Sequence, residues 1–217
     1  MSHFITVEGT EGSGKTTQFR LLEAYLVERG VPLVVTREPG GTPIGEQVRA
    51  ILHDPANQAM LARTEVLLYS AARAQLVGQV IRPARERGQV VLCDRYAEST
   101  LAYQGYGRGL DPERLGEITA FATEGLRPGL VIYLDLPVEV GLERKLRARE
   151  REGGEWTRMD QQEVAFYERV RAGYLAMASA EPGRWCVIDA QQPVDVVQAR
   201  IRTRVEALLA TGGDVRS

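Results

Sequence analysis

Residues 9–16 read Gly-Thr-Glu-Gly-Ser-Gly-Lys-Thr and fit the pattern G-x-x-x-x-G-K-[ST] of a phosphate-binding loop, or P-loop. Glycines in such a loop let the backbone curl until several N–H groups point at one cluster of phosphate oxygens. Lys15 brings a positive charge to the β and γ phosphates, and the Thr16 hydroxyl is a candidate Mg²⁺ ligand. The residues expected to bind ATP are Gly9, Thr10, Glu11, Gly12, Ser13, Gly14, Lys15, Thr16 and Thr17.

The segments on either side of the loop fit this interpretation. The apolar run at residues 4–8 predicts a buried strand before the loop, and residues 17–29 predict a helix after it. The N-terminus of that helix adds its dipole to an anion site. The loop therefore predicts an α/β fold that binds a nucleotide beside its first strand.

Composition describes an ordinary globular protein. The 217 residues suffice for one α/β domain, and no linker, repeat or low-complexity run divides residues 1–217. A formal net charge of −2 gives no basic surface for nucleic acid. No segment reaches the about 18 consecutive apolar residues of a membrane helix, and the N-terminus lacks a signal-peptide pattern. We expect a cytoplasmic protein without nucleic-acid or membrane partners.

Strand and helix patterns alternate along the chain. Strands are predicted at residues 4–8, 32–36, 89–93, 130–134 and 185–188. Further helices are predicted at residues 44–53, 60–87, 99–104, 112–123, 137–149, 161–180 and 194–209. Strands rich in Val, Ile and Leu with helical crossovers indicate a parallel sheet covered on both faces, with ligands at the carboxyl ends of its strands.

Polar residues at those strand ends suggest a second anionic substrate. Arg37 ends a strand, Arg95 follows another, and Arg73 lies one helical turn after Tyr69. Arginine forks bind phosphate bidentately, and an aromatic ring can stack on a flat base. Surface salt bridges are the alternative for Arg37 and Arg73. Glu11, inside the P-loop, is interpreted as facing the second substrate or its metal shell.

Two aspartates follow apolar strands and receive different interpretations. Asp94 has the position at which a carboxylate supports nucleotide-bound Mg²⁺, with a helix N-cap as the alternative. Asp135 is followed closely by Pro137, which predicts the start of a helix, so capping is the better interpretation there.

Residues 145–158 are basic, contain two adjacent glycines and lie between predicted helices. A solvated charged loop is one interpretation. We expect instead a mobile lid, at about residues 145–160, that brings arginines onto a transferring phosphoryl group. The chain has no N-K-x-D guanine motif and no D-x-x-G switch in the usual place, which argues against a GTPase.

Together these motifs resemble bacterial thymidylate kinases (dTMP kinases) over essentially the whole chain. The matching blocks lie at residues 8–17, 36–42, 71–73 with Tyr69, 94–96, 99–100, 102–105, 133–135, 140–142 and 158–160. The Arg-Glu-Pro-Gly-Gly block together with Asp-Arg-Tyr is hardly seen elsewhere among P-loop kinases. The resemblance implies a nucleoside monophosphate kinase fold, with a five-stranded parallel sheet, helices on both faces and a lid.

The resemblance also implies roles for individual residues. Glu11 would lie near the sugar 3′-hydroxyl, and Arg37 and Arg95 would clamp the dTMP phosphate. Tyr69 would stack on thymine, and Arg73 would donate to a thymine carbonyl. The remaining expected dTMP-binding residues are Ser99, Thr100 at the N3 edge of the base, Tyr103 under the sugar, and Gln104 nearby.

One residue implies a subtype. Some family members carry an arginine directly after the P-loop acid, where this chain has Gly12. The resemblance is therefore to members whose lid supplies the arginine, with Arg149 and Arg151 as candidates and Arg158 at the lid boundary.

The activity implied is phosphorylation of dTMP by Mg²⁺-ATP, in a homodimer. Lys15, Glu11, Arg95 and a lid arginine would be catalytic, and Thr16 and Asp94 would hold Mg²⁺. Another nucleoside or nucleotide kinase, or a non-catalytic P-loop switch, remains the alternative.

Overall fold

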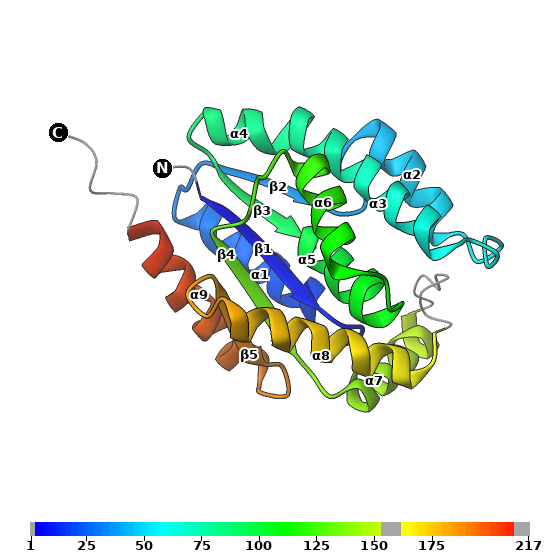
Figure 1. The fold of residues 1–217 in the computed structure, drawn as a ribbon. Coiled ribbons are helices and arrows are strands. Elements are labelled where there is room, and N and C mark those ends of the chain that lie inside the picture. Colours follow the sequence, from blue (N-terminus) through cyan, green and yellow to red (C-terminus); the bar gives the residue numbers. More distant parts are fainter. Residues whose placement is uncertain (1–2, 153–161, 211–217) are drawn as a thin grey trace.

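The computed structural model describes residues 3–152 and 162–210, which are built around a five-stranded, all-parallel β-sheet (Figure 1). The strand order is β2-β3-β1-β4-β5, so the N-terminal strand lies in the middle of the sheet. Every predicted strand is present with bounds within one residue, which confirms the expected parallel α/β fold. The bounds are Phe4–Gly9 (β1), Leu33–Arg37 (β2), Val90–Asp94 (β3), Leu130–Asp135 (β4) and Trp185–Asp189 (β5).

Helices follow each strand and cover both faces of the sheet. Their bounds are Lys15–Glu28 (α1), Pro43–His53 (α2), Ala62–Leu76 (α3), Val77–Ile81 (η1), Arg82–Glu86 (α4), Ala97–Thr100 (α5), Leu101–Gly107 (η2), Pro112–Thr123 (α6), Val138–Glu152 (α7), Val164–Ala180 (α8) and Val194–Ala210 (α9). The single helix predicted at residues 60–87 is α3 followed by the π-helical turn η1 and by α4. Pro83 has no N–H and its ring crowds the preceding turn, which a wider π turn accommodates.

Alternate side chains of the strands enter different apolar layers. Ile5 and Val7 of β1 pack with α1 and α9, whereas Phe4 packs on the opposite face with α3, η1 and α4. A third cluster joins β4 and β5 to η2 and α8 on that opposite face. The two-residue period of a strand therefore explains why helices are needed on both sides.

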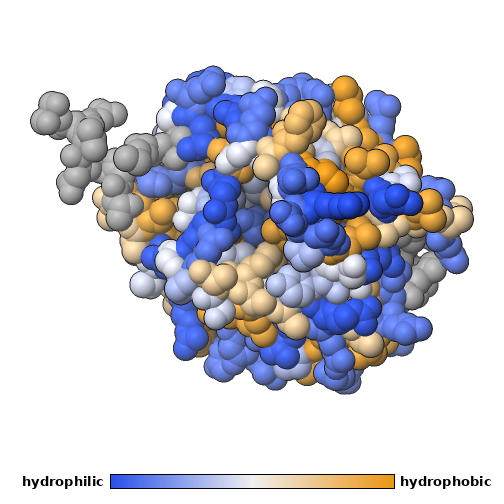
Figure 2. Space-filling model, viewed as in Figure 1, coloured by the Kyte–Doolittle hydropathy of each residue, from blue (hydrophilic) through white to orange (hydrophobic). Residues whose placement is uncertain are grey.

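Some apolar side chains stay outside these layers. Leu67 of α3 is 59% exposed and Phe121 of α6 is 88% exposed. Figure 2 shows apolar side chains among charged ones over the part of the surface that these helices form. None of the described helices is both long enough and apolar enough to span a membrane.

Asp135 has a different partner from the one that the sequence suggested. Its two carboxylate oxygens accept hydrogen bonds from Nε and Nη2 of Arg171 in α8, at 2.7 and 2.9 Å. The carboxylate therefore ties the end of β4 to α8 through an ion pair, where helix capping was the expected role.

A fully buried carboxylate, Glu8, connects β1 to two other parts of the fold. Its Oε1 accepts a hydrogen bond from the backbone N–H of Tyr96 at 2.8 Å. Its Oε2 accepts from the hydroxyls of Ser99 in α5 and Tyr174 in α8, at 2.6 and 2.8 Å. Burial raises the pKa of Glu8 to about 7, against the opposing charge of Arg95.

Replacing this carboxyl with an amide, Glu8→Gln, should flatten the pH dependence of stability. The folded-state pKa is about 7 against an ordinary value of 4.5, so below pH 4.5 the group is protonated in both states and costs nothing. As the pH rises from there, the unfolded chain ionises first and the free energy of unfolding falls, by about 3 kcal/mol once the pH passes about 7.

Chemical denaturation of both proteins at a series of pH values measures this effect. The stability of the wild type relative to Glu8→Gln should fall as the pH rises through that window. A difference that stays constant with pH would contradict the assignment.

Candidate active site

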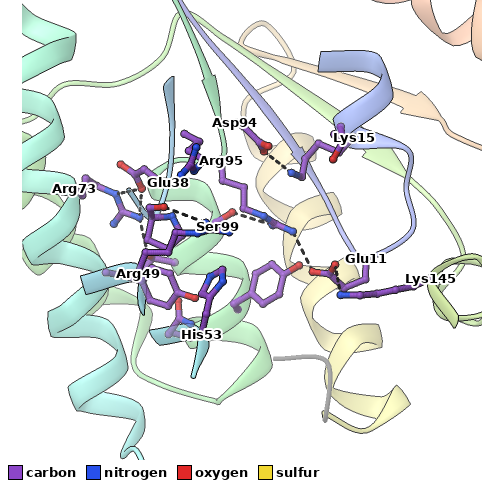
Figure 3. A pocket seen from close by; sticks show the side chains of 17 residues that line it. Glu11, Lys15, Glu38, Arg49, His53, Arg73, Asp94, Arg95, Ser99 and Lys145 are labelled. Carbon is purple, nitrogen blue, oxygen red and sulfur yellow. Dashed lines mark hydrogen bonds and ion pairs between the residues drawn. The ribbon is translucent and has the colours of Figure 1, made fainter. Parts of the chain in front are cut away.

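The carboxyl ends of β1, β2 and β3 meet at one edge of the sheet, where a cavity of about 320 Å³ opens (Figure 3). All nine residues expected to bind the second substrate line it, together with Lys15, Thr16 and Asp94. The cavity residues are Glu11, Lys15, Thr16, Arg37, Glu38, Pro39, Arg49, His53, Tyr69, Arg73, Asp94, Arg95, Ser99, Thr100, Tyr103, Gln104 and Lys145.

The P-loop runs from β1 into α1 with two glycines in the left-handed region. Gly12 has φ +69° and Gly14, directly before α1, has φ +80°. The Lys15 ammonium donates to a carboxylate oxygen of Asp94 at the end of β3. The buried hydroxyls of Thr10 and Ser13 have no hydrogen-bond partner among the described residues. These hydroxyls suit a ligand rich in oxygen acceptors, such as a polyphosphate.

Glu11 lies between two cations that come from different elements. Its Oε1 accepts from Nη2 of Arg95 at 3.3 Å, and its Oε2 accepts from Nζ of Lys145 in α7 at 3.1 Å. Burial favours the neutral acid, but the charges of Arg95, Lys145 and Lys15 outweigh it and hold the pKa of Glu11 below its ordinary value. Glu11 is therefore an ionised group that faces the cavity.

Arg73 is a buried cation whose hydrogen bonding is incomplete. Its Nε donates to Glu38 at 2.8 Å, and its Nη2 donates to the Thr100 hydroxyl at 2.9 Å and to the Tyr96 carbonyl at 3.2 Å. Its Nη1 is buried and has no partner among the described residues. A buried donor next to a cavity fits a ligand that brings its own acceptor, such as a carbonyl oxygen.

Arg37 and Gln104 reach the cavity but are held by protein partners. Nη2 of Arg37, whose side chain is 52% exposed, contacts both carboxylate oxygens of Glu46 at 2.9 Å. The amide of Gln104 donates to the buried carboxylate of Glu65 at 2.7 Å. To contact a substrate phosphate, Arg37 therefore has to leave the Glu46 carboxylate or bind both groups at once.

Two tyrosines expected at the second substrate differ in their surroundings. Tyr103 is buried, its hydroxyl has no partner among the described residues, and the Arg95 guanidinium carbon lies 5.1 Å from the centre of its ring. Tyr69 lines the cavity from α3, on the same side as Arg73. An aromatic wall, a buried arginine donor and a tyrosine hydroxyl together suit a flat, polar base and its sugar.

The donor groups near Lys15 fit Mg²⁺ bound together with phosphates. Thr16 and Asp94 offer a hydroxyl and a carboxylate, which are the oxygen ligands that Mg²⁺ prefers. The described part of the chain contains no group of three or more His, Cys, Asp or Glu side chains that could hold a metal ion. A site of this kind holds Mg²⁺ mainly through substrate phosphates and water.

Sequence reasoning missed several residues of this region. Glu38, Arg49, His53 and Lys145 line the cavity without having been singled out as site residues. Glu8 was also missed, although a carboxylate inside an otherwise apolar strand beside a P-loop was a usable signal. Of the expected lid at about residues 145–160, Lys145 at its start lines the cavity, whereas residues 153–161 and the side chains of Arg149 and Arg151 lie outside the described residues.

The comparisons with known proteins point to one family. A profile of the thymidylate kinase family matches residues 7–201. The chain is 50% identical over 218 residues to the thymidylate kinase of Roseiflexus sp. (strain RS-1), covering 97% of this chain and 96% of that protein. It is 53% identical over 212 residues to the thymidylate kinase of Thermomicrobium roseum, covering 98% of each.

A solved structure agrees with these relatives. The crystal structure of thymidylate kinase from Ehrlichia chaffeensis matches with a TM-score of 0.76 and 32% identity, over 94% of this chain and 98% of that one. The matched range of the family profile includes the P-loop and all of the residues that line the cavity. The chain therefore belongs to the thymidylate kinase family.

Proposed function

We propose that this protein transfers the γ-phosphoryl group of Mg²⁺-ATP to dTMP, giving dTDP and ADP. The observation that carries the proposal is a single cavity with a P-loop lysine at one side and Tyr69 with the incompletely bonded Arg73 at the other. A phosphoryl donor and a nucleoside monophosphate can then face one another across Glu11 and Arg95. The relatives named above, all thymidylate kinases, support dTMP as the acceptor.

Each group has a physical task in this proposal. Lys15 balances charge on the donor phosphates, while Thr16 and Asp94 would hold Mg²⁺, which supplies further charge neutralisation when bound. Arg95, with Arg37, binds the acceptor phosphate, and Glu11 accepts a hydrogen bond from the sugar hydroxyl. Arg149 or Arg151 is proposed to reach the transferred group. Rate acceleration comes from positioning two phosphates in line and from fixed positive charge around them.

A substrate panel tests the assignment. ADP release should require a nucleoside monophosphate and should have a higher kcat/KM with dTMP than with dUMP, dCMP, dGMP or thymidine. A preference for one of the others would make the chain a different nucleoside or nucleotide kinase. Nucleotide binding without acceptor-dependent turnover would make it a non-catalytic P-loop protein.

Lys15→Met should lower kcat by about 10²- to 10³-fold, because a preorganised charge on the donor phosphates is lost. The steady-state assay with dTMP measures the loss. Since Lys15 lies at the surface of the cavity, circular dichroism and thermal unfolding should show a folded protein. Retained kcat in the variant would refute the role of the P-loop.

Arg73 requires a compensated substitution, because removing it alone leaves the buried Glu38 carboxylate without its cation. Such a loss costs about 3–5 kcal/mol of stability and would mask any effect on binding. The double variant Arg73→Met with Glu38→Gln removes both charges together. We expect it to fold and to raise the KM for dTMP at least about tenfold, with a much smaller change for ATP. Equal losses for both substrates would argue against a base-reading role.

We further propose that the protein is a homodimer whose interface lies on α3, η1 and α6. A largely apolar hollow there is lined by Ala74, Val77 and Gly78 of α3 and η1, by residues 120–122 of α6, and by Glu124 directly after α6. Phe121 projects from α6 with 88% of its surface exposed. An exposed aromatic beside an apolar hollow on the same face suits a two-fold interface, because each copy offers both parts.

Phe121→Glu should convert the dimer to a monomer, because a charge would replace the central aromatic side chain. Light scattering after size-exclusion chromatography measures the mass directly. The matched control is Val27→Glu on α1, where the exposed valine is 61% accessible and lies away from this face. A monomeric wild type, or a Phe121→Glu variant that stays dimeric, would contradict the proposal.

A further inference from the structure

Lysine is rare in this chain and is confined to one place. Of 27 basic residues, two are lysines, at positions 15 and 145, and the others are arginines. Both lysines line the active-site cavity, although they lie on different helices. A lysine ammonium is a compact point charge, whereas an arginine fork can hold both oxygens of a carboxylate. At both positions the cation lies beside carboxylates of the active site. A lysine there does not hold a carboxylate as an arginine fork would.

Lys145 reaches the P-loop because α7 is packed directly against it. A Cβ built at Gly12 would lie 2.0 Å from the carbonyl oxygen of Gly141, and a Cβ built at Gly141 would lie 2.3 Å from the carbonyl oxygen of Glu11. The two backbones can approach this closely because neither glycine has a side chain. Lys145 follows Gly141 by four residues, on the same face of α7. The glycine contact therefore places the lysine beside Glu11.

The ammonium of Lys145 divides the Glu11 carboxylate between two cations. Lys145 contacts Oε2 at 3.1 Å, while Arg95 contacts Oε1 at 3.3 Å, and Figure 3 shows them on either side of the carboxylate. All three side chains are 18–23% exposed, so solvent screens these charges only in part. The contact of Arg95 with this carboxylate is single and long.

Other arginines of the same protein hold their carboxylates more completely. Arg171 holds both oxygens of Asp135 through Nε and Nη2, at 2.7 and 2.9 Å, and a single nitrogen of Arg37, Nη2, contacts both oxygens of Glu46 at 2.9 Å. The weaker hold of Arg95 on its carboxylate coincides with a lysine on the other oxygen. Contact with both oxygens is the stronger arrangement for an arginine and a carboxylate.

We propose that Lys145 is a positioning residue that keeps Arg95 available to the phosphate of the acceptor nucleotide. Because Lys145 occupies Oε2 of Glu11, Arg95 cannot bind both oxygens of that carboxylate. The charge of Arg95 is therefore not fully neutralised by Glu11. An arginine at position 145 would itself hold both oxygens and draw Glu11 away from the substrate. The inference rests on the proposed function, in which Arg95 binds the acceptor phosphate.

The test compares Lys145→Met, Lys145→Arg, Glu11→Gln and the double variant Lys145→Met/Glu11→Gln with the wild type. Calorimetry gives the Kd for dTMP, and the coupled assay gives kcat. Lys145→Met should weaken dTMP binding by about 10- to 100-fold, since Arg95 is then held by Glu11. Lys145→Arg should keep a Kd near that of the wild type but lower kcat, because Glu11 is displaced.

The double variant shows whether Lys145 acts through Glu11. In the Glu11→Gln background, Lys145→Met should change the dTMP Kd by less than about twofold, because the neutral amide no longer holds Arg95. An equal loss in both backgrounds would overturn the proposal, and so would a wild-type Kd in Lys145→Met. The matched control is Arg29→Met, which removes a charge from an exposed pair with Glu206 and should leave Kd and kcat unchanged.

A measurement without substrate separates this proposal from the proposed function. The charged groups that face Glu11 are Arg95 after β3, Lys145 on α7 and Lys15 on α1. Removing Lys145 should therefore raise the pH at which the Glu11 carboxyl ¹³C resonance titrates, with the resonance assigned by its loss in Glu11→Gln. An unchanged titration would overturn the pairing.

A wild type that phosphorylates another monophosphate would refute dTMP as the acceptor but leave the pairing intact. The Kd of each variant relative to the wild type would then be measured with that monophosphate. The same changes in Kd would support or overturn the role of Lys145.

Discussion

The parallel pairing of β1 with β3 on one side and β4 on the other is the constraint on which the rest of the structure depends. It places the P-loop at the centre of the sheet, at the point where the order of the strands reverses. Ligands of parallel sheets bind at such a point, beside the carboxyl ends of the strands. The same pairing brings Asp94 beside the P-loop, because Val7 and Asp94 are neighbours in register. Backbone hydrogen bonds from Arg95 to Val7 and from Glu38 to Asp94 extend this order into the loops. The cavity is thus a consequence of strand order.

Within this frame, several cations of the active site have carboxylate partners. Lys15 pairs with Asp94, Arg73 pairs with Glu38, and Glu11 is shared between Arg95 and Lys145. Buried or half-buried charges need such partners, because desolvation of an unpaired ion is costly. A phosphate that enters this cavity competes with carboxylates that are already in place. The strength of each cation–carboxylate pair therefore decides how readily its cation can bind the substrate. In our proposal, Lys145 matters because it weakens the pair between Arg95 and Glu11.

Much of the fold and part of the site could be predicted because their signals are local. Strand periodicity, the P-loop spacing and the arginines at strand ends lie within short segments, and the structure brings them to one cavity. The partners of these residues depend on tertiary contacts that no short segment specifies. The Arg171 partner of Asp135 and the Glu46 partner of Arg37 are examples. Lys145 was missed for the same reason, because its place beside Glu11 depends on two glycines 129 residues apart in the chain.

The most direct test of the account is a crystal structure with dTMP and a non-hydrolysable ATP analogue bound with Mg²⁺. In this complex Lys15 should leave Asp94 for the donor phosphates, and the dTMP phosphate should contact Arg95. The base should lie against Tyr69, with Nη1 of Arg73 donating to it. A complex in which Lys15 stays on Asp94, or in which the base lies away from Tyr69 and Arg73, would contradict it.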